Sequence, residues 1–176
     1  MCVRTRISDG RPVSCAEALD ANLAYLELVL RYVRGLSPGK PLVVGEFGWF
    51  GGGAAPGQVE RTQEDQARWC RSAVLQGRGL AVGWLNWALA DTPTSTDITR
   101  FSGLLTDDLR RKAWGDAFRE LARSPESWLG PGKEPEAEVT FPVGRVLVDP
   151  PAGTRALDEY TKAWMAARGC RLRVVE

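Results

Sequence analysis

Two short apolar runs with a helical stretch between them constrain the fold of this chain more than any other feature. The first run lies in KPLVVGEFGWF at 40–50, where Leu42, Val43 and Val44 predict a fully buried strand that ends at the glycines from Gly48 onward. The second run is LAVGWLNWAL at 80–89, and its aromatic residues favour a strand. About 34 residues separate the runs, which predicts a βαβ unit with parallel, adjacent strands.

Three helices are expected from apolar periodicity and capping residues. Ser14 and Glu17 have the form of a capping box at the start of a helix of about five turns, which Gly35 and Pro38 end. Thr62 is the expected cap of a second helix that runs to about Gln76. The inward residues expected of the three helices are Leu19, Leu23, Leu26, Leu30 and Val33; Ala67, Cys70, Ala73 and Val74; and Ala113, Trp114, Phe118, Leu121 and Ala122.

The C-terminal part differs in composition from what precedes it. Residues 124–138 are rich in proline, glycine and charge, as in a linker or a surface loop. Residues 139–176 read as strand, helix and strand, from VGRVLVD to CRLRVV, with a helix capped near Thr154. Its expected inward residues are Leu157, Tyr160 and Trp164. The chain is therefore expected to consist of a first domain at 1–123, a linker at 124–138 and an incomplete second α/β module at 139–176.

Composition excludes several kinds of function. A net charge of +1 over 176 residues gives no electrostatic reason to bind nucleic acid or an anionic membrane surface. The chain contains no histidine, which removes histidine-based catalysis and histidine metal ligands. Its cysteines form no C-x-x-C pair, so no metal site is expected and buried free thiols are the simplest interpretation. The start, MCVRTRISDGRP, lacks the apolar segment of a signal peptide, and the sequence leaves localisation open.

Glu46 is unusual because it ends an apolar strand, and sites in α/β folds are built at the carboxyl ends of strands. A structural alternative is an ion pair of Glu46 with Lys40 or an arginine. The second strand brings Trp84 and Trp87 to the same edge. They are three residues apart, so they should point to opposite faces of the sheet. Trp49 could line the same cleft or pack on a helix.

The segments PLVVGEFGW, GWLNWALAD, SGLLTDD and KAWGDAF, in this order, resemble the C-terminal part of the cellulase-like (β/α)8 TIM barrels of glycoside hydrolase family 5 and its clan. The resemblance implies that Glu46 is the nucleophile of a retaining β-glycosidase acting on β-linked glucan, mannan or related sugars. It implies that Trp87 is the platform for the sugar, with Trp84 and Trp49 as weaker candidates for substrate binding. No cofactor or metal is implied.

The resemblance is incomplete in one respect that matters for chemistry. In the family the acid/base glutamate follows an asparagine at the end of the fourth strand, and no segment here corresponds to it. A whole barrel takes about 250 residues, and only its last two strands are matched. We therefore expect a C-terminal fragment, either a truncated product or a misassigned start at Met1. The fragment should be inactive alone because it lacks the acid/base, which belongs to the missing N-terminal half of the barrel. Alternatives are a non-catalytic carbohydrate-binding or structural module, or a compact doubly wound α/β domain.

Overall fold

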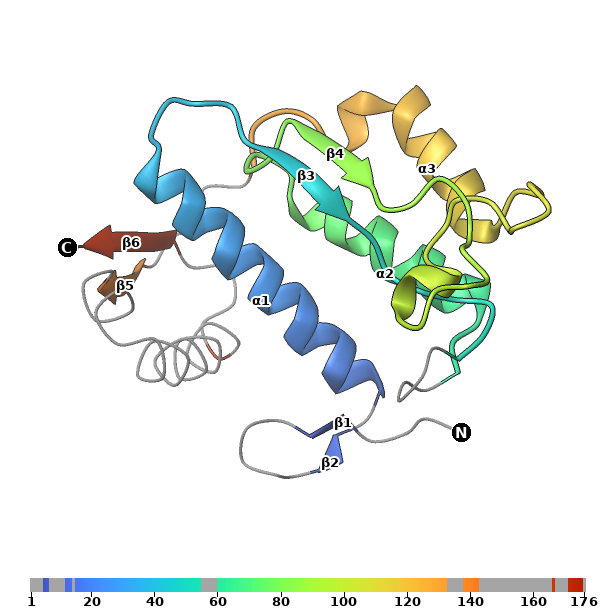
Figure 1. Ribbon diagram of the computed structural model, residues 1–176. Coiled ribbons are helices and arrows are strands. Elements are labelled where there is room, and N and C mark those ends of the chain that lie inside the picture. The colour runs from blue at the N-terminus through green and yellow to red at the C-terminus, as the bar shows by residue number, and fades with distance from the viewer. Residues whose placement is uncertain are drawn as a thin grey trace. The chain divides into compact units, whose positions relative to one another are not determined.

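The computed structural model describes residues 5–6, 12–13, 15–54, 60–132, 138–142, 166 and 171–175. Its contacts divide the chain into two compact units, one of Met1–Lys40 with Gly132–Glu176 and one of Pro41–Pro131. Each unit has parallel strands of its own (Figure 1). The domain division expected from the sequence stays a prediction.

The first unit contains the long helix α1, Cys15–Leu36, which confirms the helix expected from the leucine spacing. Its buried apolar residues are Leu23, Ala24, Leu28 and Leu30. The strand β6, Arg171–Val175, confirms the strand expected from CRLRVV; it pairs in parallel with β5, Glu138–Pro142. Two short antiparallel strands, β1 (Thr5–Arg6) and β2 (Pro12–Val13), precede α1.

Several predictions for this unit lie outside the described residues. They are the cap at Ser14, the strand expected after residue 142, and the helix near Thr154 with Leu157, Tyr160 and Trp164.

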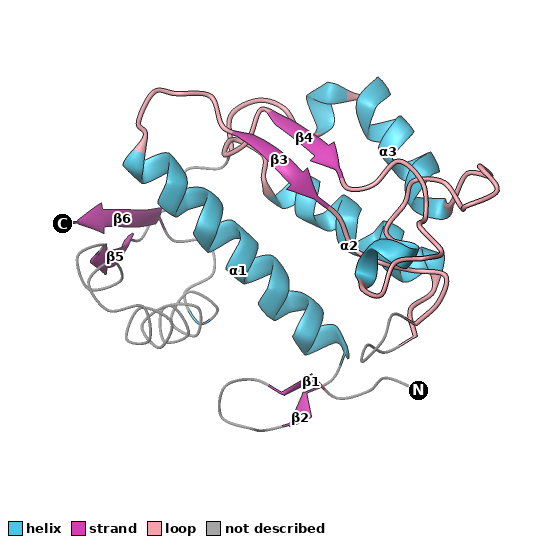
Figure 2. Cartoon of the chain, viewed as in Figure 1, coloured by secondary structure: helices cyan, strands magenta, loops and turns pink. Residues whose placement is uncertain are grey.

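The second unit confirms the βαβ prediction. Its elements, in order, are β3 (Val43–Phe47), α2 (Gln63–Gln76), β4 (Gly83–Asn86), η1 (Ile98–Phe101), α3 (Ala113–Arg123) and η2 (Pro125–Ser127). β3 and β4 are parallel and adjacent, and a long loop joins β4 to α3 (Figure 2). No helix in the part of the chain that the structure describes is both long enough and apolar enough to cross a membrane.

Local signals explain where α2 begins and ends. The side chain of Thr62 accepts a hydrogen bond from the backbone of Asp65, 3.0 Å away, and the Asp65 carboxylate accepts one from the backbone of Thr62. This reciprocal capping box satisfies two amide groups that a helix start leaves unpaired. Gly77 follows the last residue of the helix. The cap predicted at Thr62 is therefore confirmed.

An aromatic cluster joins the sheet to both helices of this unit. Phe47 of β3 stacks on Trp69 of α2 at 5.8 Å between ring centroids and meets Trp114 of α3 edge-on at 6.0 Å. The ring of Trp84, on β4, lies 4.9 Å from that of Phe47. Because one phenyl ring contacts side chains of α2 and α3, both helices cover the same face of the sheet.

The opposite face of this sheet is open, which corrects the expectation of a fully buried first strand. Val43 is 52% exposed and Leu85 is 59% exposed. Strands of parallel sheets are usually covered on both faces, and in the described part of this unit only one face is covered. Two smaller expectations are also wrong. Ala122 is exposed on α3, and Leu89 lies beyond β4 and is exposed, because β4 ends at Asn86.

Candidate functional site

A register shift in β3 determines where Glu46 lies. Val44 pairs with Trp84 and Phe47 with Asn86, so three steps along β3 correspond to two along β4. The extra residue is a β-bulge, which lets Val44 and Phe47 both face the helices. Since successive side chains alternate, Glu46, directly before the buried Phe47, lies on the open face. Its exposure agrees with this placement.

The carboxylate of Glu46 is free in the described part of the chain. None of the hydrogen bonds or ion pairs among those residues involves it. The alternative of an ion pair with Lys40 or an arginine is therefore not observed among the described residues. A carboxylate near the end of β3 that has no partner among the described residues is available to a ligand.

Trp84 and Trp87 differ in exposure, and Trp87 lies directly after the last residue of β4. The side chain of Trp84 is buried against Phe47, whereas Trp87 is 53% exposed. The backbone N–H of Trp87 donates a hydrogen bond of 2.8 Å to the carbonyl oxygen of Phe47, the residue after Glu46. The ends of the two strands are therefore in direct contact, and Trp87 rather than Trp84 has a face to offer a ligand.

Trp49 packs against a helix. Its ring stacks on that of Trp69 with centroids 4.8 Å apart. The Arg61 guanidinium lies over the Trp49 ring, 5.9 Å from its centroid, in a cation–π contact. The sequence left open whether Trp49 lines the cleft or packs on a helix. These contacts favour packing.

Gly48 allows the two strand ends to approach. A Cβ atom added there would collide with the carbonyl oxygen of Trp87, so only glycine fits at this point without a shift of backbone. Gly45, which shares the bulge with Glu46, has nothing within 4 Å of the place where its Cβ would be. The two glycines therefore have different roles: one permits close packing, and the other lies beside open space.

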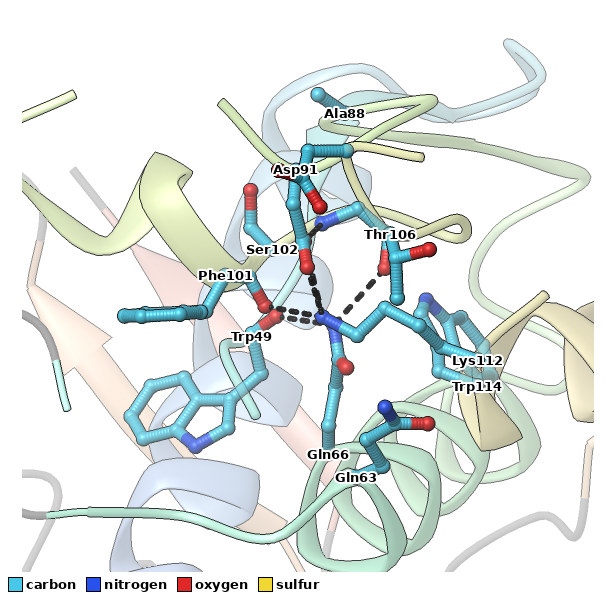
Figure 3. Close-up of polar contacts among 12 residues, drawn as sticks. Trp49, Gln63, Gln66, Ala88, Asp91, Phe101, Ser102, Thr106, Lys112 and Trp114 are labelled. Carbon is cyan, nitrogen blue, oxygen red and sulfur yellow. Dashed lines mark hydrogen bonds and ion pairs between the residues drawn. The ribbon is translucent and has the colours of Figure 1, made fainter. Parts of the chain in front are cut away.

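A buried ion pair holds the loop that follows β4 (Figure 3). The Lys112 ammonium donates hydrogen bonds to both carboxylate oxygens of Asp91, at 2.9 and 3.0 Å, and to the carbonyl oxygen of Phe101 at 2.8 Å. Its side chain is fully buried and that of Asp91 is 11% exposed. The backbone N–H of Gly103 donates to the same carboxylate at 2.8 Å. This pair was not predicted from the sequence.

Burial shifts the pKa of each partner in the direction that favours its neutral form. Desolvation raises the pKa of the Asp91 carboxyl, while the hydrogen bond and the charge of Lys112 act in the opposite direction. Desolvation also lowers the pKa of the Lys112 ammonium, which the Asp91 carboxylate opposes. All three ammonium hydrogens have acceptors, so this lysine fixes a loop and has no hydrogen to offer a substrate.

Gln66 connects the loop after β3 with the loop after β4. Its amide nitrogen donates to the carbonyl oxygen of Trp49 at 2.8 Å and to that of Gly103 at 3.4 Å (Figure 3). The residue is fully buried on α2. It therefore fixes the loop after β3 against the loop after β4, and both loops adjoin the candidate site.

Cys70 is a free, buried thiol, as the sequence predicts. Desolvation raises the pKa of this thiol, so it stays protonated and is not a nucleophile. The side chains of Cys2, Cys15 and Cys170 lie outside those described. Within the described residues, no group of three or more cysteine, aspartate or glutamate side chains is arranged to bind a metal ion.

Comparison with known proteins finds the fold in solved structures alone. No protein-family model and no curated protein matches the chain. A GH5_18 protein of Bifidobacterium longum subsp. longum, solved in complex with Manβ1-4GlcNAc, matches 88% of this chain with a TM-score of 0.63 and 20% identity. A GH5_18 protein of Streptomyces cattleya, solved with GlcNAc, matches 89% with a TM-score of 0.64 and 19% identity. The match covers 38% of either structure.

These similarities define the class of fold. The chain resembles glycoside hydrolase family 5 structures, and its small parallel sheet with covering helices is part of such a (β/α)8 barrel. It spans about two fifths of the length of the structures it matches, with 37% for a GH5_18 protein of Bifidobacterium longum subsp. infantis. The resemblance found in the sequence is thus confirmed at the level of fold.

Proposed function

We propose that this chain carries the nucleophile and the sugar platform of a retaining β-glycosidase. The observation on which the proposal rests is the β-bulge, which puts Glu46 on the open face of the sheet, with no partner among the described residues. The exposed Trp87 directly follows the adjacent strand, β4. Bulges are frequent next to active sites, where they redirect a side chain. The glycosidase-like fold supports a carbohydrate as the substrate, and one of the matched structures holds a β-linked mannosyl disaccharide.

In the proposed reaction a Glu46 oxygen attacks the anomeric carbon of the sugar. A carbon–oxygen ester bond forms as the glycosidic bond breaks, and the leaving oxygen takes the electron pair and a proton from an acid. Water then attacks the ester with help from the same group acting as a base. That group is a second carboxyl about 5–5.5 Å from the first. We assign it to the barrel half missing from this chain, so the chain alone should not turn over substrate.

Trp87 supplies a flat apolar surface beside the nucleophile. The aliphatic C–H face of a pyranose ring packs on such an indole, which favours one orientation of the anomeric carbon. Trp84 cannot take this role in the described unit because its ring is buried in the aromatic cluster.

The nucleophile can be tested without the missing acid. In 2-deoxy-2-fluoro-β-mannosyl fluoride the leaving group is fluoride, which departs with the bonding electron pair and needs no proton. The fluorine at C2 destabilises the positively charged transition state, so the mannosyl ester persists. We expect mass spectrometry of the 176-residue chain to show one added fluoromannosyl group, located at Glu46 by peptide mapping.

Two variants make this test specific. Glu46→Gln should abolish labelling, because an amide does not form the ester, and it should leave the unfolding transition unchanged since the position is exposed. Glu64→Gln, an exposed glutamate in the first turn of α2, is the matched control and should label like the wild type. Labelling of Glu46→Gln at the wild-type rate would exclude Glu46 as the nucleophile.

A further inference from the structure

Asn86 holds the backbone on both sides of the proposed sugar platform. It is the last residue of β4, directly before Trp87. Its side-chain oxygen accepts a hydrogen bond of 2.7 Å from the indole N–H of Trp114, and its amide nitrogen donates one of 2.8 Å to the carbonyl oxygen of Ala88. The backbone N–H of Leu104 donates to the same Ala88 carbonyl at 3.2 Å. The segment that carries Trp87 is therefore fixed before and after that residue.

Trp114, to which Asn86 is bonded, is itself immobilised by packing. It is fully buried on α3, and its ring meets those of Phe47 at 6.0 Å and Phe118 at 5.3 Å, both edge-on. Phe47 directly follows Glu46. The buried indole of Trp114 thus contacts Phe47, which follows the proposed nucleophile, and Asn86, which precedes the proposed platform.

The indole of Trp87 has little else to set its direction. It is 53% exposed and takes part in no ring contact among the described residues. The direction in which an exposed ring leaves the chain depends on the backbone that carries it. For Trp87, that backbone is held by the side chain of Asn86 and by the hydrogen bond from the Trp87 N–H to the Phe47 carbonyl.

We propose that Asn86, held by Trp114, is a positioning residue that sets the direction of the Trp87 indole relative to Glu46. The proposal rests on the proposed function for the role of Trp87 as a sugar platform. The positioning itself is a property of the fold and can be measured without a sugar.

The direct test is fluorine NMR of the 176-residue chain with 5-fluorotryptophan at every tryptophan, the Trp87 line being assigned by its loss in Trp87→Phe. Asn86→Asp keeps an oxygen for the Trp114 N–H but replaces the donor that faces the Ala88 carbonyl. Trp114→Phe keeps an aromatic ring and removes the N–H. We expect the Trp87 line to shift and broaden in both variants. Trp128→Phe is the matched control: it also loses an indole hydrogen bond, to Leu121, and should leave the Trp87 line unchanged.

A second arm measures the dissociation constant for Manβ1-4GlcNAc. Loss of one positioning hydrogen bond predicts a constant about fivefold higher in Asn86→Asp than in the wild type. Should Asn86→Asp fail to fold, Trp114→Phe tests the same connection. An unchanged Trp87 line in the folded variants would overturn the positioning role, whatever the sugar does. A displaced line together with a wild-type chain that binds no sugar supports the positioning role and counts against the proposed platform.

Discussion

Lys112 and Asp91 form a charged pair where almost no water reaches, and each depends on the other. Removing one partner of a buried pair leaves an uncompensated charge, which costs about 3–5 kcal/mol. Lys112→Met should therefore lower the free energy of unfolding by about that amount in a urea titration at neutral pH. The double variant Asp91→Asn/Lys112→Met leaves no buried charge and should recover most of the loss. Equal destabilisation in the single and the double variant would contradict this account.

An exposed ion pair gives the matched control for the Lys112 substitution. The side chain of Arg110 is 78% exposed and lies 2.7 Å from the Asp108 carboxylate. Water and salt screen such a pair, so Arg110→Met should leave the unfolding curve unchanged.

The Lys112→Met variant also predicts a pH dependence. Burial raises the pKa of Asp91, and the variant removes the lysine that opposes the rise. When the pKa of a carboxyl is higher in the folded than in the unfolded protein, protonation of that carboxyl stabilises the folded state. For Asp91 this stabilisation is complete below the unfolded pKa of about 3.9 and is lost as the pH rises through the folded pKa. The stability gap between wild type and variant should accordingly be smaller at pH 4 than at pH 7.

At the scale of elements, Gly45 in β3 and Gly48 in the loop after it give a matched pair of substitutions. Gly48→Ala places a Cβ against the carbonyl of Trp87 and should cost about 1–3 kcal/mol, since the strand ends must separate. Gly45→Ala meets only open space and should be close to neutral. Thermal unfolding of the two variants measures the difference. Equal effects would mean that the contact of Phe47 and Trp87 does not depend on Gly48.

The helices and the parallel pairing could be predicted from the sequence because their signals are local. Thr62 and Asp65 lie within one turn, and two apolar runs with a helix between them allow few topologies. The bulge could not be predicted, because VVGEF reads as one continuous run whose register depends on β4. Asp91 and Lys112 lie 21 positions apart in polar segments, where a charge usually faces water.

The site shows the same division between local and non-local information. The sequence singled out Glu46 by its place at a strand end, and the spacing of Trp84 and Trp87 predicted that one would face away from the other. Which of the two is exposed depends on the face that α2 and α3 cover. The link from Asn86 to Trp114 joins residues 28 positions apart, and no sequence motif marks it.

At the scale of the whole molecule, the open face of the sheet should give the chain a measurable affinity for apolar ligands. Leu85 and Val43 are more than half exposed there. We expect the 176-residue chain to raise the fluorescence of anilinonaphthalene sulfonate at neutral pH. Leu85→Lys should reduce that signal while changing the free energy of unfolding by less than about 0.5 kcal/mol.

A leucine elsewhere on the surface controls for this effect. Leu75 is 38% exposed on α2, the helix on the covered face, and Leu75→Lys should leave dye binding as it is in the wild type. Absence of dye binding by the wild-type chain would show that another part of the protein covers the face in solution.

The bulge leaves position 45 with unusual freedom to vary. Gly45 is exposed, its backbone lies outside the left-handed region, and nothing surrounds the place of its Cβ. Almost any side chain can therefore replace it without disturbing the core, and each would lie next to Glu46. Random changes there would alter the surroundings of the Glu46 carboxylate at little cost to folding, so selection for a new ligand could begin one residue from the proposed nucleophile.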